Sequence, residues 1–225
     1  MRRHALVTGA SSGIGAAIVQ QLLDDGWQVT GLSRRDAVRE QAGYRSRQVD
    51  LCDSGALAAT LSDLPPPQAV VHAAGMMHAA PLGELDAAAS RWLWQLHVLA
   101  AETLVTTLAP NMSAGGRIVL LGSRTSRGAA GRSQYAATKA AMVGMVRSWA
   151  AELAPRGITA NVVAPGATQT PMLEQPGRQS SPPKLPPIGR YIQPQEVAAL
   201  VAFLLSAPAA AITGQEMVIC GGASL

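Results

Sequence analysis

The chain has 225 residues, of which 48% are hydrophobic and 14% are charged, and its formal net charge is +4. This composition excludes a disordered chain and is typical of one globular domain with a sizeable core. The basic residues form no block with interleaved aromatic residues, and one Phe and three Tyr are few for stacking on bases. Nucleic acid is therefore not an expected partner, whereas a basic balance could equally serve a phosphorylated cofactor.

The two cysteines, Cys52 and Cys220, give neither a disulfide framework nor the spacing of metal ligands, so we expect no metal. The apolar stretch near the N-terminus is too short for a signal peptide. The longest late apolar run, 197–205, is too short to span a bilayer. We expect a cytoplasmic protein without a membrane partner.

A short apolar run at 5–7 leads into Thr8-Gly9-Ala10-Ser11-Ser12-Gly13-Ile14-Gly15, and a helical apolar pattern follows as far as Gly26. A strand, a glycine-rich turn and a helix in this order form a site for a dinucleotide pyrophosphate. The glycines allow close approach of the backbone, and the helix N-terminus offers N–H groups. The spacing Gly-x-x-x-Gly-x-Gly also suits a mere tight turn, but its position between strand and helix favours the dinucleotide.

The second predicted strand, 28–32, is followed by Ser33-Arg34-Arg35. In a dinucleotide fold an acidic residue here binds the ribose 2′-hydroxyl of NAD, whereas an arginine accommodates the 2′-phosphate of NADP. Arg34 therefore indicates NADP(H), the alternative being a solvated arginine pair in a loop. A third strand is predicted at 47–51, where Asp50 could bind the adenine amine beside Leu51.

A helix is predicted at 56–64 and a strand at 69–72, leading into Ala73-Ala74-Gly75. These small residues would let a cofactor ribose lie against the backbone. His72 is predicted to pack or hydrogen-bond at the strand end rather than to catalyse. Met76-Met77-His78 forms either a loop packed by flexible methionines or a pliable substrate wall, and we favour the first.

A long helix is predicted from Asp86, its cap, to Asn111, with Trp92 and Trp94 suited to a subunit contact. The near-continuous apolar run 116–122 is typical of a parallel strand covered on both faces. Ser123 follows it directly, at the strand end where open α/β sheets bind ligands.

The predicted helix 133–153 places Tyr135 and Lys139 one turn apart on the same face. An ammonium beside a phenol favours the phenolate and lowers its pKa from near 10. With Ser123 bonding the oxygen of an alcohol or carbonyl, Tyr135 could then act as general acid or base. Alone, so short a pattern usually means a packed tyrosine beside a solvated lysine, so the rest of the chain must support it.

A strand at 158–164 ends in Pro165-Gly166, and the proline-rich stretch 168–194 follows. A loop of this length in a compact domain is usually functional, and we expect it to form a lid over the site. A helix at 196–205 and a strand at 216–219 complete the alternation. The pattern favours an α/β fold, a single domain over 1–225 built on a doubly wound parallel sheet.

Together these motifs resemble the short-chain dehydrogenase/reductase (SDR) family over essentially residues 6–222. The motifs are Thr8-Gly9-x-x-x-Gly13-x-Gly15, Asp50, Ala73-Ala74-Gly75, Ser123, Tyr135-x-x-x-Lys139, Pro165-Gly166 and Thr213-Gly214-Gln215. The resemblance implies a seven-stranded Rossmann sheet assembled as a homo-oligomer, a dimer or tetramer. Ser33-Arg34 is similar to the NADP(H)-preferring members, including carbonyl reductases.

By this resemblance Tyr135 is the acid/base, Lys139 lowers its pKa and binds the nicotinamide ribose, and Ser123 positions the reacting oxygen. The nicotinamide carboxamide would meet the segment after Pro165-Gly166. The cofactor-binding residues so implied are Gly9, Ser11, Ser12, Gly13, Ile14, Gly15, Ser33, Arg34, Asp50, Leu51, Ala73, Ala74, Gly75, Tyr135, Lys139, Pro165, Gly166, Thr168 and Thr170.

The chain departs from the family pattern at four places. His97 occupies the position of an Asn that supports a proton-relay water, and it could relay protons itself or merely fill space. The Ser-to-Tyr spacing is one residue shorter than usual, Ala73 replaces an Asn, and Cys220-Gly221-Gly222 replaces Asp-Gly-Gly. Because Ser123, Tyr135 and Lys139 are all present, we expect an active enzyme.

The leading hypothesis is an oxidoreductase that transfers a hydride between NADP(H), or else NAD(H), and a small carbonyl or secondary alcohol. Reduction of a ketone or aldehyde is the favoured reaction. The alternative is a catalytically silent dinucleotide-binding regulator or scaffold, for which His97 is the only support. Four loop cations could favour an anionic substrate, although solvated charges are the plainer interpretation: Arg124, Arg127, Arg178 and Lys184.

Overall fold

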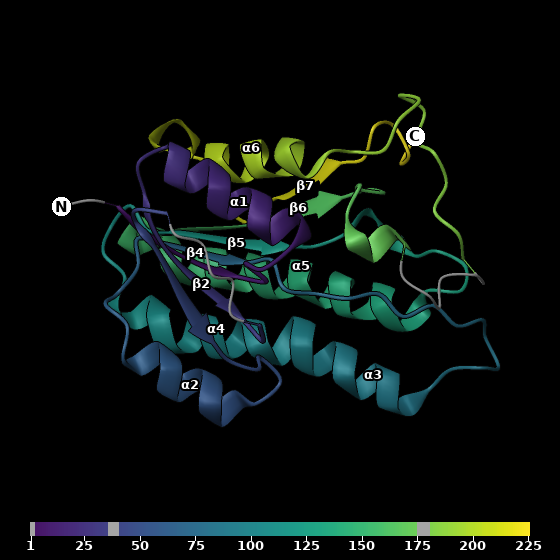
Figure 1. Ribbon diagram of the computed structural model, residues 1–225, viewed down its shortest axis with the longest axis horizontal. Coiled ribbons are helices and arrows are strands. Elements are labelled where there is room, and N and C mark those ends of the chain that lie inside the picture. Colours follow the sequence, from purple (N-terminus) through teal and green to yellow (C-terminus); the bar gives the residue numbers. More distant parts are fainter. Residues whose placement is uncertain (1–2, 36–40, 175–180) are drawn as a thin grey trace.

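The computed structural model describes residues 3–35, 41–174 and 181–225, and over these residues the strands form one parallel sheet (Figure 1). Its seven strands lie in the order β3-β2-β1-β4-β5-β6-β7. Their bounds are β1 His4–Thr8, β2 Gln28–Ser33, β3 Tyr44–Gln48, β4 Ala69–His72, β5 Arg117–Leu121, β6 Thr159–Pro165 and β7 Glu216–Ile219. The predicted seven-stranded Rossmann sheet is confirmed.

Helices cover both faces of the sheet (Figure 1). On one face α1 (Gly13–Asp24) packs against α6 (Pro194–Leu205), and on the other α2 (Ser54–Ser62), α3 (Ala87–Trp94), α4 (Ala100–Leu108) and α5 (Ser133–Leu153) lie together. Short turns complete the chain: the π-helix η1 Gln95–Leu99, and the 3-10 helices η2 Ala109–Asn111, η3 Arg124–Arg127, η4 Ala154–Arg156, η5 Pro171–Glu174 and η6 Ala207–Ala209. The layers are those of a doubly wound fold.

The sheet separates two hydrophobic cores because successive side chains of a strand point to opposite faces. In β1, Leu6 enters the core under α4 and α5, whereas Ala5 and Val7 enter the core under α1 and α6. All three are completely buried. Full burial of a side chain such as Leu6 contributes about 1.5–3 kcal/mol, so this alternation stabilises both layers at once.

The third strand lies three residues before its predicted position at 47–51. The prediction followed the apolar Val49 and Leu51, but both leave the sheet and are buried in the core under α4 and α5. The strand itself is an outer one, pairing only with β2, and it carries exposed Arg45 and Arg47. An edge strand needs no apolar run, which is why its position was missed.

The predicted helix from Asp86 to Asn111 is correct in extent but not uniform. The Asp86 carboxylate accepts hydrogen bonds from the N–H groups of Ala88 and Ala89, at 2.8 and 3.2 Å, so the cap is confirmed. Between α3 and α4 the backbone widens into the π-helix η1. Such a turn is common at functional sites, and this one contains His97.

Candidate active site

The turn after β1 forms a cradle that only glycine can build. A Cβ atom on Gly15 would lie 2.2 Å from the carbonyl oxygen of Gly9, and one on Gly9 would lie 2.8 Å from the amide nitrogen of Ala74. Gly13 has a φ of +55° and faces the side chain of Thr170. The Ser12 side chain makes no capping bond to α1, so it does not obstruct the N-terminus of that helix. These residues fit a dinucleotide pyrophosphate at the helix N-terminus.

The loop after β2 lies beside this cradle. The side-chain amide of Gln48 donates to the carbonyl oxygen of Arg34 at 2.9 Å, which fixes the turn while the Arg34 side chain is exposed. Ser33 is buried and its hydroxyl donates to a backbone carbonyl of the same turn. One carboxylate oxygen of Asp50 accepts from the amide of Cys52 at 2.9 Å, and Leu51 is buried. Adenine binding by Asp50 and Leu51 stays a prediction.

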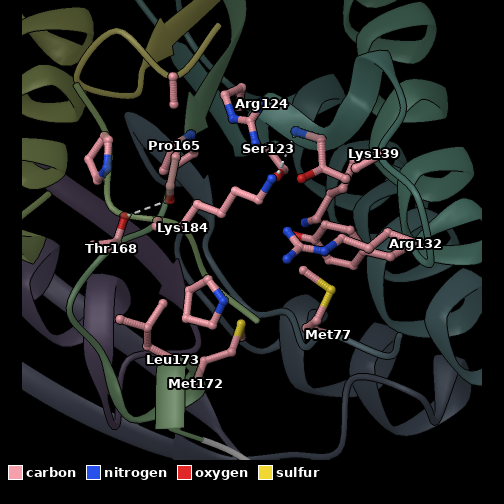
Figure 2. A pocket seen from close by; sticks show the side chains of 18 of the residues that line it. Met77, Ser123, Arg124, Arg132, Lys139, Pro165, Thr168, Met172, Leu173 and Lys184 are labelled. Carbon is pink, nitrogen blue, oxygen red and sulfur yellow. Dashed lines mark hydrogen bonds between the residues drawn. The ribbon is translucent and has the colours of Figure 1, made fainter. Parts of the chain in front are cut away.

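Ser123, Tyr135 and Lys139 line one cavity of about 620 Å³ (Figure 2). Ser123 follows β5, and its Oγ accepts from the amide of Thr125 at 3.1 Å. The buried Lys139 Nζ donates to the carbonyl oxygen of Leu121 at 2.8 Å and lies 5.8 Å from the centre of the Tyr135 ring. Burial lowers the pKa of Lys139 to about 7. The strand end and helix α5 thus bring all three predicted residues together.

His97 lies beside this set with both ring nitrogens hydrogen-bonded. The Thr138 hydroxyl donates to the carbonyl oxygen of Tyr135, so it accepts from the protonated Nδ1 of His97 at 2.9 Å. The opposite nitrogen, Nε2, accepts from the amide of Met76 at 3.2 Å. Burial, assisted by the charge of Lys139, lowers the pKa of His97 well below its usual value. The ring is therefore neutral and holds helix α5 to the loop after β4, with no nitrogen left for a relay water.

His72 makes a second, oppositely protonated link. The Thr8 hydroxyl accepts from the amide of Ala74 at 3.1 Å, and it donates at 2.9 Å to Nδ1 of His72, because the other ring nitrogen must carry the proton to reach a carbonyl. Its protonated Nε2 donates to the carbonyl oxygen of Leu96, at 3.1 Å, within the π-helix. Burial, then the charge of Lys139, lowers the pKa of His72 to about 3. The predicted hydrogen-bonding role of His72 is confirmed, and the loop 73–76 is held at both ends by neutral histidines.

The remaining predicted cofactor residues divide between the cavity and the cradle. Ile14, Ala73, Gly75, Pro165, Gly166, Thr168 and Thr170 line the cavity itself. Ser11, Ser12, Ala74 and the adenosine-side residues lie outside its lining. The C-terminal segment adds Gly222, Ala223 and Leu225 to the wall.

Methionines form part of the cavity wall, contrary to the favoured interpretation of residues 76–78. Met76 and Met77 are half-buried and line the cavity, and Met172 and Leu173 of η5 face the same space (Figure 2). The loop is therefore not closed by its own packing. The pair Met76-Met77, directly after Ala73-Ala74-Gly75, was the feature of the sequence that could have indicated this wall.

The loop cations do not share one environment: Arg127 and Lys184 are exposed, as expected of solvated charges, whereas Arg124 is half-buried in the cavity wall. Arg124 and Lys184 line the cavity, as does Arg132, to which no role was assigned from the sequence. Arg127 is not part of the cavity lining: its side chain is 70% exposed and lies 3.6 Å from Glu216. Arg178 lies outside the described residues, as do other residues of the predicted lid at 168–194.

The predicted lid is described on either side of 175–180. Its near part forms η5 and its far part, 181–187, lines the cavity. Arg132 donates to the hydroxyl and the carbonyl oxygen of Ser181, at 2.9 and 2.8 Å, which ties the far part to the loop before α5.

In the part of the chain that the structure describes, no helix is long and apolar enough to cross a bilayer.

Known proteins are similar to this chain over nearly its whole length. Residues 9–224 match a family model described as enoyl-(acyl carrier protein) reductase. An uncharacterized oxidoreductase, YmfI of Bacillus subtilis, is 36% identical over 99% of this chain and 99% of its own. A short-chain dehydrogenase family protein from Francisella tularensis superposes with a TM-score of 0.92 at 26% identity, covering 100% of this chain and 99% of that one. A short-chain dehydrogenase from Burkholderia cenocepacia, solved in complex with NADP, gives 0.89 at 33% identity over 99% and 98%.

Proposed function

The chain belongs to the short-chain dehydrogenase/reductase family, and we propose that it transfers a hydride between NADP(H) and a carbonyl or secondary alcohol. One observation carries this proposal: Ser123, Tyr135 and Lys139 line a single cavity together with Ile14 of the glycine-rich turn. Reduction of a ketone or aldehyde is the proposed direction.

Tyr135, Ser123 and Lys139 have separate roles in the proposed reduction. The nicotinamide, when bound, supplies the hydride that the carbonyl carbon accepts. As the C=O electron pair moves to oxygen, that oxygen takes a proton from the Tyr135 hydroxyl and a hydrogen bond from Ser123 Oγ. The ammonium of Lys139, held near the Tyr135 ring, favours the phenolate that remains. Oxidation of an alcohol uses the same groups in reverse.

Preference for NADP(H) rests on Arg34. Its side chain is exposed at the carboxyl end of β2, next to the strand that leads into the glycine cradle. A guanidinium there suits a ribose 2′-phosphate, and the residue at the strand end is Ser33 rather than an acid that would bind a 2′-hydroxyl. The NADP bound to the Burkholderia cenocepacia relative is consistent with this proposal.

The test is fluorescence-detected binding of NADPH and NADH to the wild type, Arg34→Asp and Arg35→Asp. Arg35→Asp is the matched control, because it makes the same charge change one residue further on. We expect NADPH to bind the wild type more tightly by about 10- to 100-fold, the range for charge-assisted hydrogen bonds. Arg34→Asp should remove this preference and Arg35→Asp should retain most of it. Equal binding of the two nucleotides by the wild type would overturn the assignment.

The silent regulator is kept as a second candidate because of His97. Its neutral ring uses both nitrogens at the position where a proton relay is expected. Turnover separates the candidates: NADPH oxidation with a panel of ketones and aldehydes, lost in Tyr135→Phe while NADPH binding persists, would establish the enzyme. Binding without turnover on any member of the panel would favour the regulator.

We also propose a homo-oligomer, a dimer or tetramer. Trp94 and Leu99 are 39% and 42% exposed one turn or so apart at the junction of α3 and α4. Large apolar side chains that are exposed together suit a subunit contact. Light scattering of the wild type and of Trp94→Glu tests it, and a monomeric wild type would contradict it.

A further inference from the structure

The cavity has a strongly one-sided charge. Arg124, Arg132 and Lys184 enter it from different sides (Figure 2), in addition to Lys139 at its base. Among the lining residues that the structure describes, none has a carboxylate side chain. Several cationic side chains without an acidic side chain among them attract anions and raise their local concentration. Because nothing in the hydride transfer itself requires Arg124 or Lys184, this charge calls for a separate explanation.

Arg124 is the most informative of these cations because its neighbours on η3 behave differently. The Ser126 hydroxyl donates to the Glu216 carboxylate at 2.7 Å, and Arg127 lies 3.6 Å from the same group. Arg124 instead faces the cavity, half-buried, and has no acidic partner within the described part of the chain. The same short helix thus places one arginine beside the carboxylate of Glu216, whose side chain is only 14% exposed, and the other in the cavity wall.

A half-buried guanidinium gains most when a carboxylate or phosphate completes its hydrogen bonds, since its planar donors match such oxyanions in pairs. Arg124 follows Ser123 directly in sequence, and both residues line the same cavity. One small molecule in this cavity could therefore place an anionic group at Arg124 and a carbonyl oxygen at Ser123.

The second cation reaches the same space from the far part of the predicted lid. Ser181 is held by two hydrogen bonds from Arg132. The backbone that carries Lys184, three residues later, is therefore held near the loop before α5. Another part of the wall is apolar, formed by Met76, Met77 and Leu173 among others. An anionic end and an apolar body are thus both accommodated.

We propose that the substrate is an organic anion: a keto acid, or the corresponding hydroxy acid, whose carboxylate binds Arg124 with help from Lys184 and whose apolar body contacts the methionine wall. This inference rests on the proposed function, since it assumes that Ser123 and Tyr135 act on the carbonyl of that molecule. It adds what the reaction chemistry alone leaves open, namely the substrate class.

The first test compares kcat/KM for 2-oxo-4-phenylbutanoate and for its ethyl ester, with NADPH as the reductant. The ester keeps the carbonyl and the apolar body but removes the charge. We expect the wild type to prefer the acid by about 10- to 100-fold, the range of a charge-assisted hydrogen bond. Arg124→Gln and Lys184→Gln should reduce this acid-to-ester ratio, Arg124→Gln by more. Arg127→Gln, the control on the same helical turn, should keep the wild-type ratio.

A second test does not depend on turnover. The NADPH complex is titrated with 4-phenylbutanoate and with 4-phenylbutanamide, neither of which can be reduced at a ketone. The carboxylate should bind the wild type at least about 10-fold more tightly, and Arg124→Gln should abolish the difference while Arg127→Gln does not. Equal binding of acid and amide would overturn the proposal even if ketones were reduced. Arg124-dependent binding of the acid without any reduction would keep the anion site and refute the proposed function instead.

Discussion

Lowering the pH should destabilise this protein through His72 in particular. The ring is completely buried between Thr8 and the carbonyl of Leu96, and Lys139 lies near enough to oppose a second positive charge. Burial therefore holds its pKa at about 3 in the folded chain, against 6.5 when unfolded. Because the folded pKa is the lower one, the stabilisation is complete above pH 6.5 and is lost as the pH falls toward 3.

The magnitude follows from the separation of the two pKa values. Between pH 6.5 and pH 4.5, an interval of two pH units, the unfolded chain binds a proton at His72 and the native chain does not. At 1.36 kcal/mol per unit, the native state loses about 2.7 kcal/mol relative to pH 8. His97, whose pKa is also lowered, contributes in the same direction. Lys139, with a pKa of about 7, is protonated through most of this window and keeps opposing the charge.

The assay is urea unfolding at several pH values between 8 and 4.5, for the wild type and His72→Gln. Glutamine can still donate to the carbonyl of Leu96 but does not titrate, so it isolates the histidine from the carboxylates that also respond to pH. The variant should be less stable at pH 8, yet its free energy of unfolding should fall by about 2–3 kcal/mol less on acidification. Parallel pH dependences for the two proteins would refute the reasoning.

Three further predictions use the same contacts. Gly15→Ala should lower the affinity for NADPH more than about 10-fold in an equilibrium titration, because the new Cβ would lie 2.2 Å from a backbone oxygen of the cradle. The control Gly144→Ala should leave the affinity unchanged, because no atom lies within 4 Å of its new Cβ. Thr138→Val should cost about 1–3 kcal/mol in urea unfolding because it leaves the buried Nδ1–H of His97 without an acceptor; an unaltered unfolding midpoint would contradict the bond. Since Lys139 has a pKa of about 7 in the free enzyme, kcat/KM should decline above that pH as the ammonium is lost. Lys139→Arg should move the decline to higher pH. A flat profile from pH 6 to 9 would argue against a role of the ammonium in lowering the pKa of Tyr135.

Much of the fold could be read from local patterns. The continuous apolar runs of β1, β4, β5 and β6 predict buried parallel strands, and all their residues but His4 are buried. Helix α5 has the predicted bounds, and with Ser123 at the strand end it brings the acid/base candidates into one cavity. These features depend on neighbouring residues and on the rule that parallel strands end at one edge of the sheet.

Other features depend on contacts between distant segments, and local patterns carry little information about them. The position of β3 was missed because Val49 and Leu51 serve a core rather than a strand. The bonds of His97 join residues 21 and 41 positions away. No composition rule separates Arg124 from Arg127, since only the fold places Glu216 beside one of them.

The outer strand β3 has a consequence for solubility under stress. An unpaired strand edge can recruit a strand from another molecule, and chains of such additions lead to insoluble aggregates. Here a recruited copy of the same edge would bring Arg45 and Arg47 against like charges, which opposes the addition. The two arginines thus act as gatekeepers against self-templating, a task that concerns the partly unfolded population rather than the working enzyme.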